Sequence, residues 1–267
     1  MTDTAADAES TTENLIVEKD QGIGYLGLNR PEKHNAISYE MWQGIARVMD
    51  DFESDAEVRV IVVSGEGGKA FSAGADIAQF EQKRGSADAI EVYNAALQLA
   101  QQKLTELAKP TIARIAGYCI GGGLAIALCC DLRIASDDSK FGIPAARLGL
   151  GYGYDSLRSL VDLIGPTYAK EMLFTARRFS AAETYDMGLV NRVLPRDELD
   201  GFVNEYAETI AGNAPLTVKA CKQIIAEICK DPDGRDLDLC SRLIDDCFAS
   251  ADYKEGRTAF MEKRKPK

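Results

Sequence analysis

A glycine triplet at the start of an apolar run is the feature that most limits how this chain can fold. Residues 111–115 predict a buried strand, and the residues after Gly121, Gly122 and Gly123 predict a helix without a polar face. The first amides of such a helix lack intrahelical acceptors and carry partial positive charge, which favours an anion. The stretch therefore predicts either an oxyanion or phosphate cradle, or a tight turn that lets the helix pack closely on a sheet.

The order of the other predicted elements indicates an α/β protein. Strands are expected at 15–19, 23–28, 58–63, 111–115 and 131–135. Helices are expected at 38–52 and 87–107, and the first two strands form a hairpin around Gly22. Because the later strands alternate with helices, right-handed parallel crossovers are favoured.

Composition along the chain divides it into three parts. Residues 1–13 are rich in Thr, Ala, Asp and Glu without apolar periodicity, which predicts a disordered tail. Residues 14–195 mix strands and helices, whereas residues 196–267 have a wholly helical pattern. We therefore expect a core at 14–195 followed by a helical region.

The overall composition argues against several classes of site. One histidine and seven cysteines without a CxxC or CxxH pair predict reduced thiols and no metal site. The formal net charge of −11 argues against nucleic-acid binding, which needs a clustered basic face. The chain has no apolar run of about 18 to 20 residues and no signal sequence, so we expect a soluble, cytoplasmic protein without a membrane partner.

Several segments occur together in an order that resembles the enoyl-CoA hydratase/isomerase (crotonase) superfamily. They are Asn29-Arg30-Pro31, Asn35-Ala36, residues 71–77, Gly117-Tyr118 with the glycine triplet, Phe141-Gly142-Ile143-Pro144, residues 187–191, Glu255-Gly256, Ala259-Phe260 and Glu262-Lys263-Arg264. The resemblance covers residues 14–267. It implies a crotonase (ClpP-like) fold, in which repeated ββα units form a superhelical core and an α-helical region makes trimers that can pair into hexamers.

The resemblance also implies an acyl-CoA thioester substrate, a role in fatty acid metabolism, no separate cofactor and no metal. In this family two backbone amides stabilise the enolate oxygen formed on the thioester carbonyl, and the matching donors here are Ala75 and Gly122. Losing one such donor typically costs about 3 to 4 kcal/mol. Positions that match contacts to the CoA are Lys33, Ala73, Asp76, Ile77, Phe260 and Lys263. The alternatives are a helix cap for Asp76, helix packing for Phe260 and solvated charges for the two lysines.

Two departures from the family pattern change the expected chemistry. Family hydratases carry glutamates at the positions of Ala125 and Ala145, where they activate water and protonate carbon. Neither alanine can transfer a proton, so the two-glutamate hydratase mechanism is not carried over.

The loop before the next predicted helix offers a replacement. Asp155, beside Tyr152 and Tyr154, is the candidate proton-transfer group, and partial desolvation there would raise its pKa. The alternatives are a helix N-cap for Asp155 and packing for the two tyrosines.

The sequence thus predicts an acyl-CoA enzyme, a lyase or isomerase with Ala75 and Gly122 as oxyanion donors and Asp155 as proton-transfer group. The alternative is a non-catalytic acyl-CoA binding or scaffold protein that kept the fold after losing both glutamates. RNA binding is disfavoured by the acidic balance of the chain.

Overall fold

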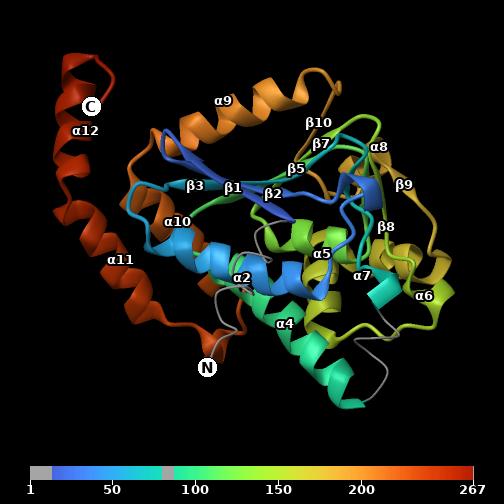
Figure 1. Cartoon of the computed structure of the whole chain (residues 1–267). Coiled ribbons are helices and arrows are strands. Elements are labelled where there is room, and N and C mark those ends of the chain that lie inside the picture. The colour runs from blue at the N-terminus through green and yellow to red at the C-terminus, as the bar shows by residue number, and fades with distance from the viewer. Residues whose placement is uncertain (1–13, 80–86, 267) are drawn as a thin grey trace, which may run out of the picture.

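A six-stranded sheet forms the centre of the computed structural model, which describes residues 14–79 and 87–266 (Figure 1). The predicted tail at 1–13 lies outside the described residues. The strands, in their order across the sheet, are β1 (Leu15–Asp20), β2 (Ile23–Leu28), β3 (Val60–Gly65), β5 (Thr111–Ile115), β7 (Leu132–Ser136) and β10 (Arg192–Leu194). Only the β1–β2 pair is antiparallel. The predicted hairpin and the parallel crossovers are therefore confirmed.

A second, four-stranded sheet was not predicted from the sequence. Its strands are β4 (Ala70–Ser72), β6 (Tyr118–Ile120), β8 (Lys140–Gly142) and β9 (Phe179–Ser180). Each has only two or three residues, which is too short to show a period of two. The strands β3, β5 and β7 of the first sheet are each followed by one of these short strands and then a helix. This is the expected pattern of repeated ββα units.

Helices cover both faces of the central sheet (Figure 1). On one face lie α2 (Tyr39–Ser54), α4 (Ala87–Glu106) and α5 (Gly122–Cys129), and α2 begins as predicted with the Ser38 hydroxyl accepting a hydrogen bond from the amide of Met41. On the other face α9 (Leu199–Ala211) buries Leu199, Val203 and Ala207, four residues apart, against the strands. The helical region that starts near 196 thus contributes its first helix to the core.

The remaining helices complete the core and continue beyond it. They are α6 (Ala145–Leu148), α7 (Tyr154–Thr175), α8 (Ala181–Asp186), α10 (Pro215–Ile228), α11 (Leu237–Ala249), α12 (Ala251–Glu262) and the 3-10 turns η1 (Pro31–Lys33), η2 (Ile77–Gln79) and η3 (Pro232–Gly234). A kink at Gly165, whose φ is 73°, divides α7 just before Pro166. The helices α11 and α12 extend along the side of the molecule as an arm (Figure 1). No helix in the described part of the chain is both long and apolar enough to cross a lipid bilayer.

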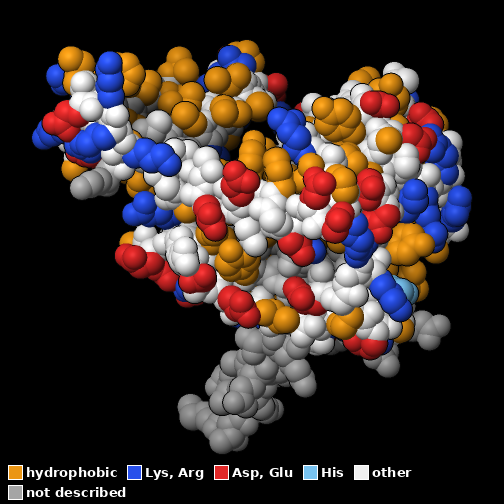
Figure 2. All heavy atoms as spheres, turned by 90° about the horizontal axis from the view of Figure 1, so that it is seen from above, with side chains coloured by type: hydrophobic (Ala, Val, Ile, Leu, Met, Phe, Trp, Pro, Cys, Tyr) orange, Lys and Arg blue, Asp and Glu red, His pale blue; other side chains and the backbone are white. Residues whose placement is uncertain are grey.

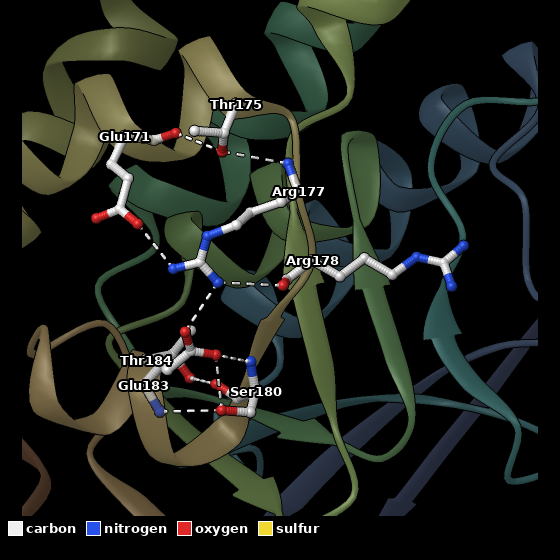
Figure 3. A network of polar contacts seen from close by, with 7 residues as sticks. All are labelled: Glu171, Thr175, Arg177, Arg178, Ser180, Glu183 and Thr184. Carbon is white, nitrogen blue, oxygen red and sulfur yellow. Dashed lines mark hydrogen bonds and ion pairs between the residues drawn. The ribbon is translucent and has the colours of Figure 1, made fainter.

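A network around Arg177 connects α7 to β9 and α8 (Figure 3). The Arg177 guanidinium pairs with Glu171 at 2.7 Å and with Glu183 at 2.8 Å, and it lies over the ring of Phe179. Glu183 also accepts hydrogen bonds from the amide and hydroxyl of Ser180, which closes a capping box at the start of α8. The network fixes β9 beside β8, the strand whose last carbonyl anchors the glycine triplet described below.

This network predicts a change in stability at acid pH. Hydrogen bonds from the Ser180 amide, Arg177 and the Ser180 hydroxyl lower the pKa of Glu183 to about 2, below its ordinary value of 4.5. A carboxyl with a depressed folded pKa stabilises the fold above its unfolded pKa and loses that contribution as the pH falls through the interval between the two. Wild type should therefore lose its advantage in melting temperature over Glu183→Gln as the pH falls from about 5 to about 2.5. A constant difference across that range would contradict the assignment.

Candidate active site

The loop that carries Ala75 is held by hydrogen bonds on both sides of that residue. The amide of Ile37 donates to the carbonyl of Gly74 at 2.7 Å, and the amide of Asp76 donates to the carbonyl of Ile37 at 2.9 Å. Among the described residues the amide of Ala75 itself finds no acceptor. The loop is thus fixed while one of its donors stays available.

The amide of Gly122, the first residue of α5, lies next to that of Ala75. A Cβ atom added to Gly122 would lie 3.3 Å from the Ala75 nitrogen and 3.4 Å from the ring of Trp42. Gly74 has a φ of 105°, which favours glycine, and a Cβ atom there would lie 3.4 Å from the Gly122 nitrogen. Since Gly122 also finds no acceptor within the described ranges, two unpaired amides border one small space. The fully buried Trp42 ring, which sequence reasoning missed, lies beside that space.

The two interpretations of the glycine triplet apply to different residues. Gly123 is needed for packing, because a Cβ atom there would lie 2.6 Å from the carbonyl oxygen of Ser72. Gly121 has a φ of 51° and donates its amide to the carbonyl of Gly142 at 2.9 Å. Gly122 combines an amide without an acceptor among the described residues with a position beside the amide of Ala75, as the anion-binding interpretation requires.

Asp76 and Arg30 form a buried ion pair behind the loop. Their closest atoms, Nη2 and Oδ2, are 2.9 Å apart, and Lys33 approaches the same carboxylate oxygen at 3.4 Å. Although burial raises the pKa of Asp76, the hydrogen bond and charge of Arg30 outweigh it and lower that pKa. This protein's own cations thus occupy the Asp76 carboxylate, and a contact of Asp76 with a CoA stays a prediction. The capping alternative holds, since Asp76 accepts a hydrogen bond from the amide of Ala78 in η2.

Asn35 stabilises the same region, a role that the sequence did not predict although Asn35 belongs to one of the segments that carry the family resemblance. Its side chain is fully buried, accepts a hydrogen bond from the amide of Arg30 and donates to the carbonyls of Glu66 and Ala70. These bonds join the segment before α2 to the glycine-rich loop that leads into β4. A buried amide with three satisfied bonds holds the two segments together.

A buried cation fixes the far end of α5. The Arg133 guanidinium donates to the carbonyls of Ala127 at 3.2 Å, Cys130 at 2.6 Å and Leu189 at 2.7 Å. Burial lowers the pKa of this guanidinium. Because the last carbonyls of a helix carry partial negative charge, a cation here stabilises α5 and so the position of its first amide.

Replacing Arg133 should destabilise the fold measurably. Arg133→Met is expected to lower the free energy of unfolding by about 3 kcal/mol, because bonds from a charged group are lost and the released carbonyls stay buried. Urea denaturation followed by circular dichroism measures this change. Arg133→Lys, which keeps the charge but has a less extensive donor set, should lose less, and a Met variant as stable as wild type would refute the role.

A cavity of about 440 Å³ borders one face of α5. Its lining includes Gly121, Ala125, Tyr152 and Asp155. Ala125, at one of the two positions where family hydratases carry glutamate, therefore faces open space, whereas Ala145 is buried and does not line the cavity. The structure thus brings the loop carboxylate, one tyrosine and the start of α5 to one place.

Two expectations about the loop at 151–155 need correction. Asp155 is exposed rather than desolvated. It is the second residue of α7 and not its N-cap, because Gly153 occupies that position. Tyr152 is partly buried, which raises its pKa, whereas Tyr154 is 74% exposed and does not line the cavity.

The other residues matched to CoA contacts do not gather in one place within a chain. Ala73, Ile77 and Lys33 are exposed near the Ala75 loop. Phe260 is 81% exposed and lines a separate apolar groove of about 790 Å³ among α10, α11 and α12, while Lys263 ends α12. The helix α12 lies on the arm, away from α5 and α7 (Figure 1). Phe260 and Lys263 therefore cannot complete the cavity of their own chain in this arrangement.

Within residues 14–79 and 87–266, no group of three or more His, Cys, Asp or Glu side chains could hold a metal ion. All seven cysteines are free thiols. Burial raises the pKa of Cys129, which lines the cavity, to about 11 although Thr105 opposes the change. This residue is therefore a neutral thiol at neutral pH and a poor nucleophile.

The architecture defines a protein of the crotonase-fold class. A solved enoyl-CoA hydratase/carnithine racemase from Magnetospirillum magneticum superposes with a TM-score of 0.90, at 34% identity over 96% of this chain and 95% of that one. A crotonyl-CoA hydratase from Syntrophomonas wolfei is 36% identical over 95% of this chain and 96% of its own length. A short-chain-enoyl-CoA hydratase from Clostridium acetobutylicum is 36% identical over 94% and 96%. Residues 18–267 match the enoyl-CoA hydratase/isomerase family, and the chain belongs to it.

Proposed function

We propose that the protein binds an acyl-CoA thioester and stabilises the enolate of its acyl group. The observation that carries this proposal is the pair of unpaired amides of Ala75 and Gly122, which lie next to Gly121 at the edge of the cavity. Fixed amides aimed at an oxygen that becomes negative stabilise the transition state more than the ground state. The hydrogen bonds on both sides of Ala75 hold its donor in place before substrate arrives.

Asp155 is the proposed proton-transfer group. It lines the same cavity as Ala125 and Gly121, so an acyl chain lying along α5 would pass it. A carboxylate within hydrogen-bond reach of the α-carbon could take its proton, and the same group could return the proton to another carbon. We propose a lyase or isomerase reaction that passes through this enolate. An isomerase returns the proton at another carbon, whereas a lyase expels a leaving group from the β-carbon, and neither needs a cofactor besides the acyl-CoA substrate.

The hydratase names of the relatives do not decide the reaction here. Ala125 and Ala145 replace the two glutamates of the family mechanism, so addition of water would need another base. Deuterium exchange at the α-carbon of saturated acyl-CoA esters in D₂O, followed by NMR, tests enolate formation whatever the final product. Turnover of enoyl-, 3-oxoacyl- and malonyl-type esters then identifies the reaction class.

A non-catalytic acyl-CoA binding or scaffold protein is the second candidate. The two alanines at the glutamate positions favour it. Calorimetric binding of CoA esters without exchange or turnover would support this alternative and overturn the enzymatic proposal. Absence of binding would refute both.

The arm formed by α11 and α12 supports a proposal of homotrimers, which can pair into hexamers. Figure 2 shows hydrophobic side chains gathered on the side of the molecule that carries these helices. Leu237, Phe248, Phe260 and Met261 are 68%, 58%, 81% and 80% exposed. Apolar exposure of this extent is typical of a surface covered in an assembly. Light scattering of the purified protein measures the mass of the assembly.

The proposed location is the cytoplasm. Free thiols are typical of proteins in a reducing compartment, which supports this proposal.

A further inference from the structure

Three helices form most of the cavity wall, and their faces differ in polarity. The face along α5 is made of the N-cap Gly121, of Ala125 four residues later, and of Leu128 and Cys129, which follow Ala125 by three and four residues. Opposite walls come from α4 and from the first turns of α7. The cavity therefore extends along α5, away from the end that carries the unpaired amide of Gly122.

The wall supplied by α4 is entirely polar. It consists of Gln98, Gln101, Gln102, Thr105 and Glu106, and their recurrence after three and four residues places them on one side of the helix. On α7 the wall adds Asp155, Ser156 and Ser159, so nine of the fourteen lining residues have polar side chains once Tyr152 is included. Hydrocarbon groups are held by apolar side chains, and polar side chains fix and select a ligand. This cavity offers an apolar face along α5 and hydrogen-bonding groups on α4 and α7.

The charges in the wall limit which polar groups fit. Glu106 and Asp155 are acidic, and no Lys, Arg or His is among the described residues that line the cavity. The Gln102 amide donates to both carboxylate oxygens of Glu106 at 3.1 Å, so Glu106 is already partly satisfied. An acyl group that ends in a second carboxylate would meet like charge without a counterion, whereas a neutral hydroxyl could bond to glutamine or serine.

The length of the cavity sets the size of the acyl group. From Gly121 to Cys129 the helix rises about 12 Å at 1.5 Å per residue. An extended chain advances about 1.2 Å per bond, so roughly ten bonds cover that length. An acyl chain with its thioester at Gly122 would then reach the polar α4 wall beyond its β-carbon, because Thr105 of that wall lies beside Cys129.

We propose that the cavity selects medium-length acyl chains that carry neutral hydroxyl groups beyond the β-carbon, over plain and carboxylated chains. This inference rests on the proposed function for the acyl-CoA ligand but not for the reaction. The observation that supports it is the contrast between the apolar face of α5 and the polar faces of α4 and α7.

Isothermal titration calorimetry with saturated esters tests the inference without any turnover. The probes are octanoyl-CoA, its ω-hydroxy derivative and its ω-carboxy derivative. One additional satisfied hydrogen bond should make the hydroxy ester bind about fivefold more tightly than octanoyl-CoA, and the carboxy ester should bind more weakly than the hydroxy ester.

A variant pair connects that preference to the wall. Gln101→Leu, on a half-buried residue of α4, should abolish the hydroxyl preference and retain binding of octanoyl-CoA. Gln43→Leu, on a half-buried glutamine of α2 outside the cavity, should keep the preference. Equal binding of the hydroxy and plain esters by wild type would overturn the inference and leave the proposed function intact. Preference without deuterium exchange would support the inference while refuting enolate formation, and absence of all binding would refute both.

Discussion

Gly122→Pro is expected to slow deuterium exchange at the α-carbon of a bound acyl-CoA about 10²- to 10³-fold, the usual effect of losing one oxyanion donor. Proline removes the amide hydrogen of Gly122 and is tolerated at the first position of a helix, which is where Gly122 lies. The preceding Gly121 has a φ of 51° and a ψ of −114°, a conformation that a glycine adopts without strain. The slower exchange should therefore result from the missing amide donor and not from a disrupted start of α5.

Gly122→Ala separates the effect of removing the amide donor from the effect of adding side-chain atoms. Alanine keeps the amide hydrogen, and its Cβ atom would lie 3.3 Å from the Ala75 nitrogen and 3.4 Å from Trp42. Those contacts are tight, so some loss is expected, but a smaller one than for proline. Equal exchange rates in the proline variant and wild type would exclude Gly122 as an oxyanion donor.

Asp155→Asn is expected to reduce turnover and α-proton exchange at least about 10²-fold, because general acid and base groups contribute about 10²- to 10⁴-fold. Asparagine has nearly the same shape but cannot take a proton. Binding of a saturated ester should change little, since the exposed carboxylate is not needed to hold the loop. A large loss of rate with unchanged affinity separates proton transfer from substrate binding.

Asp162→Asn provides the matched control on the same helix. Asp162 is exposed, pairs with Arg158 at 3.5 Å and does not line the cavity. Its substitution should leave the rate within about twofold of wild type, because an exposed pair contributes little to the fold. If Asp155→Asn behaved like this control, another group would have to carry the proton.

Sequence reasoning predicted the larger elements because their patterns are long enough to be periodic. The hairpin of β1 and β2 and the helix α2 with its Ser38 cap follow from apolar spacing and one capping residue. The strands β4 and β6 have three residues each and therefore show no pattern. The second sheet becomes visible only when both are placed beside β8.

The sequence predicted the two backbone segments of the candidate site, but it did not predict most of the side-chain contacts that hold them. The glycine triplet and the Ala75 loop were found because glycine marks special backbone geometry. The Arg30–Asp76 pair joins residues 46 positions apart, and pairing over such a distance has no local signal. The exposure of Asp155 likewise depends on how little of the surrounding chain covers it. Long-range packing decides both features.

The use of main-chain amides at Ala75 and Gly122 has a consequence for how this protein can change under mutation. Every residue except proline supplies a backbone N–H, so side-chain substitutions seldom delete these donors. Proton-transfer groups are side chains, and one nucleotide change can remove them, as Ala125 and Ala145 illustrate. The carbonyl-activating half of the proposed chemistry is therefore robust to mutation, whereas the half that selects the reaction is free to diverge.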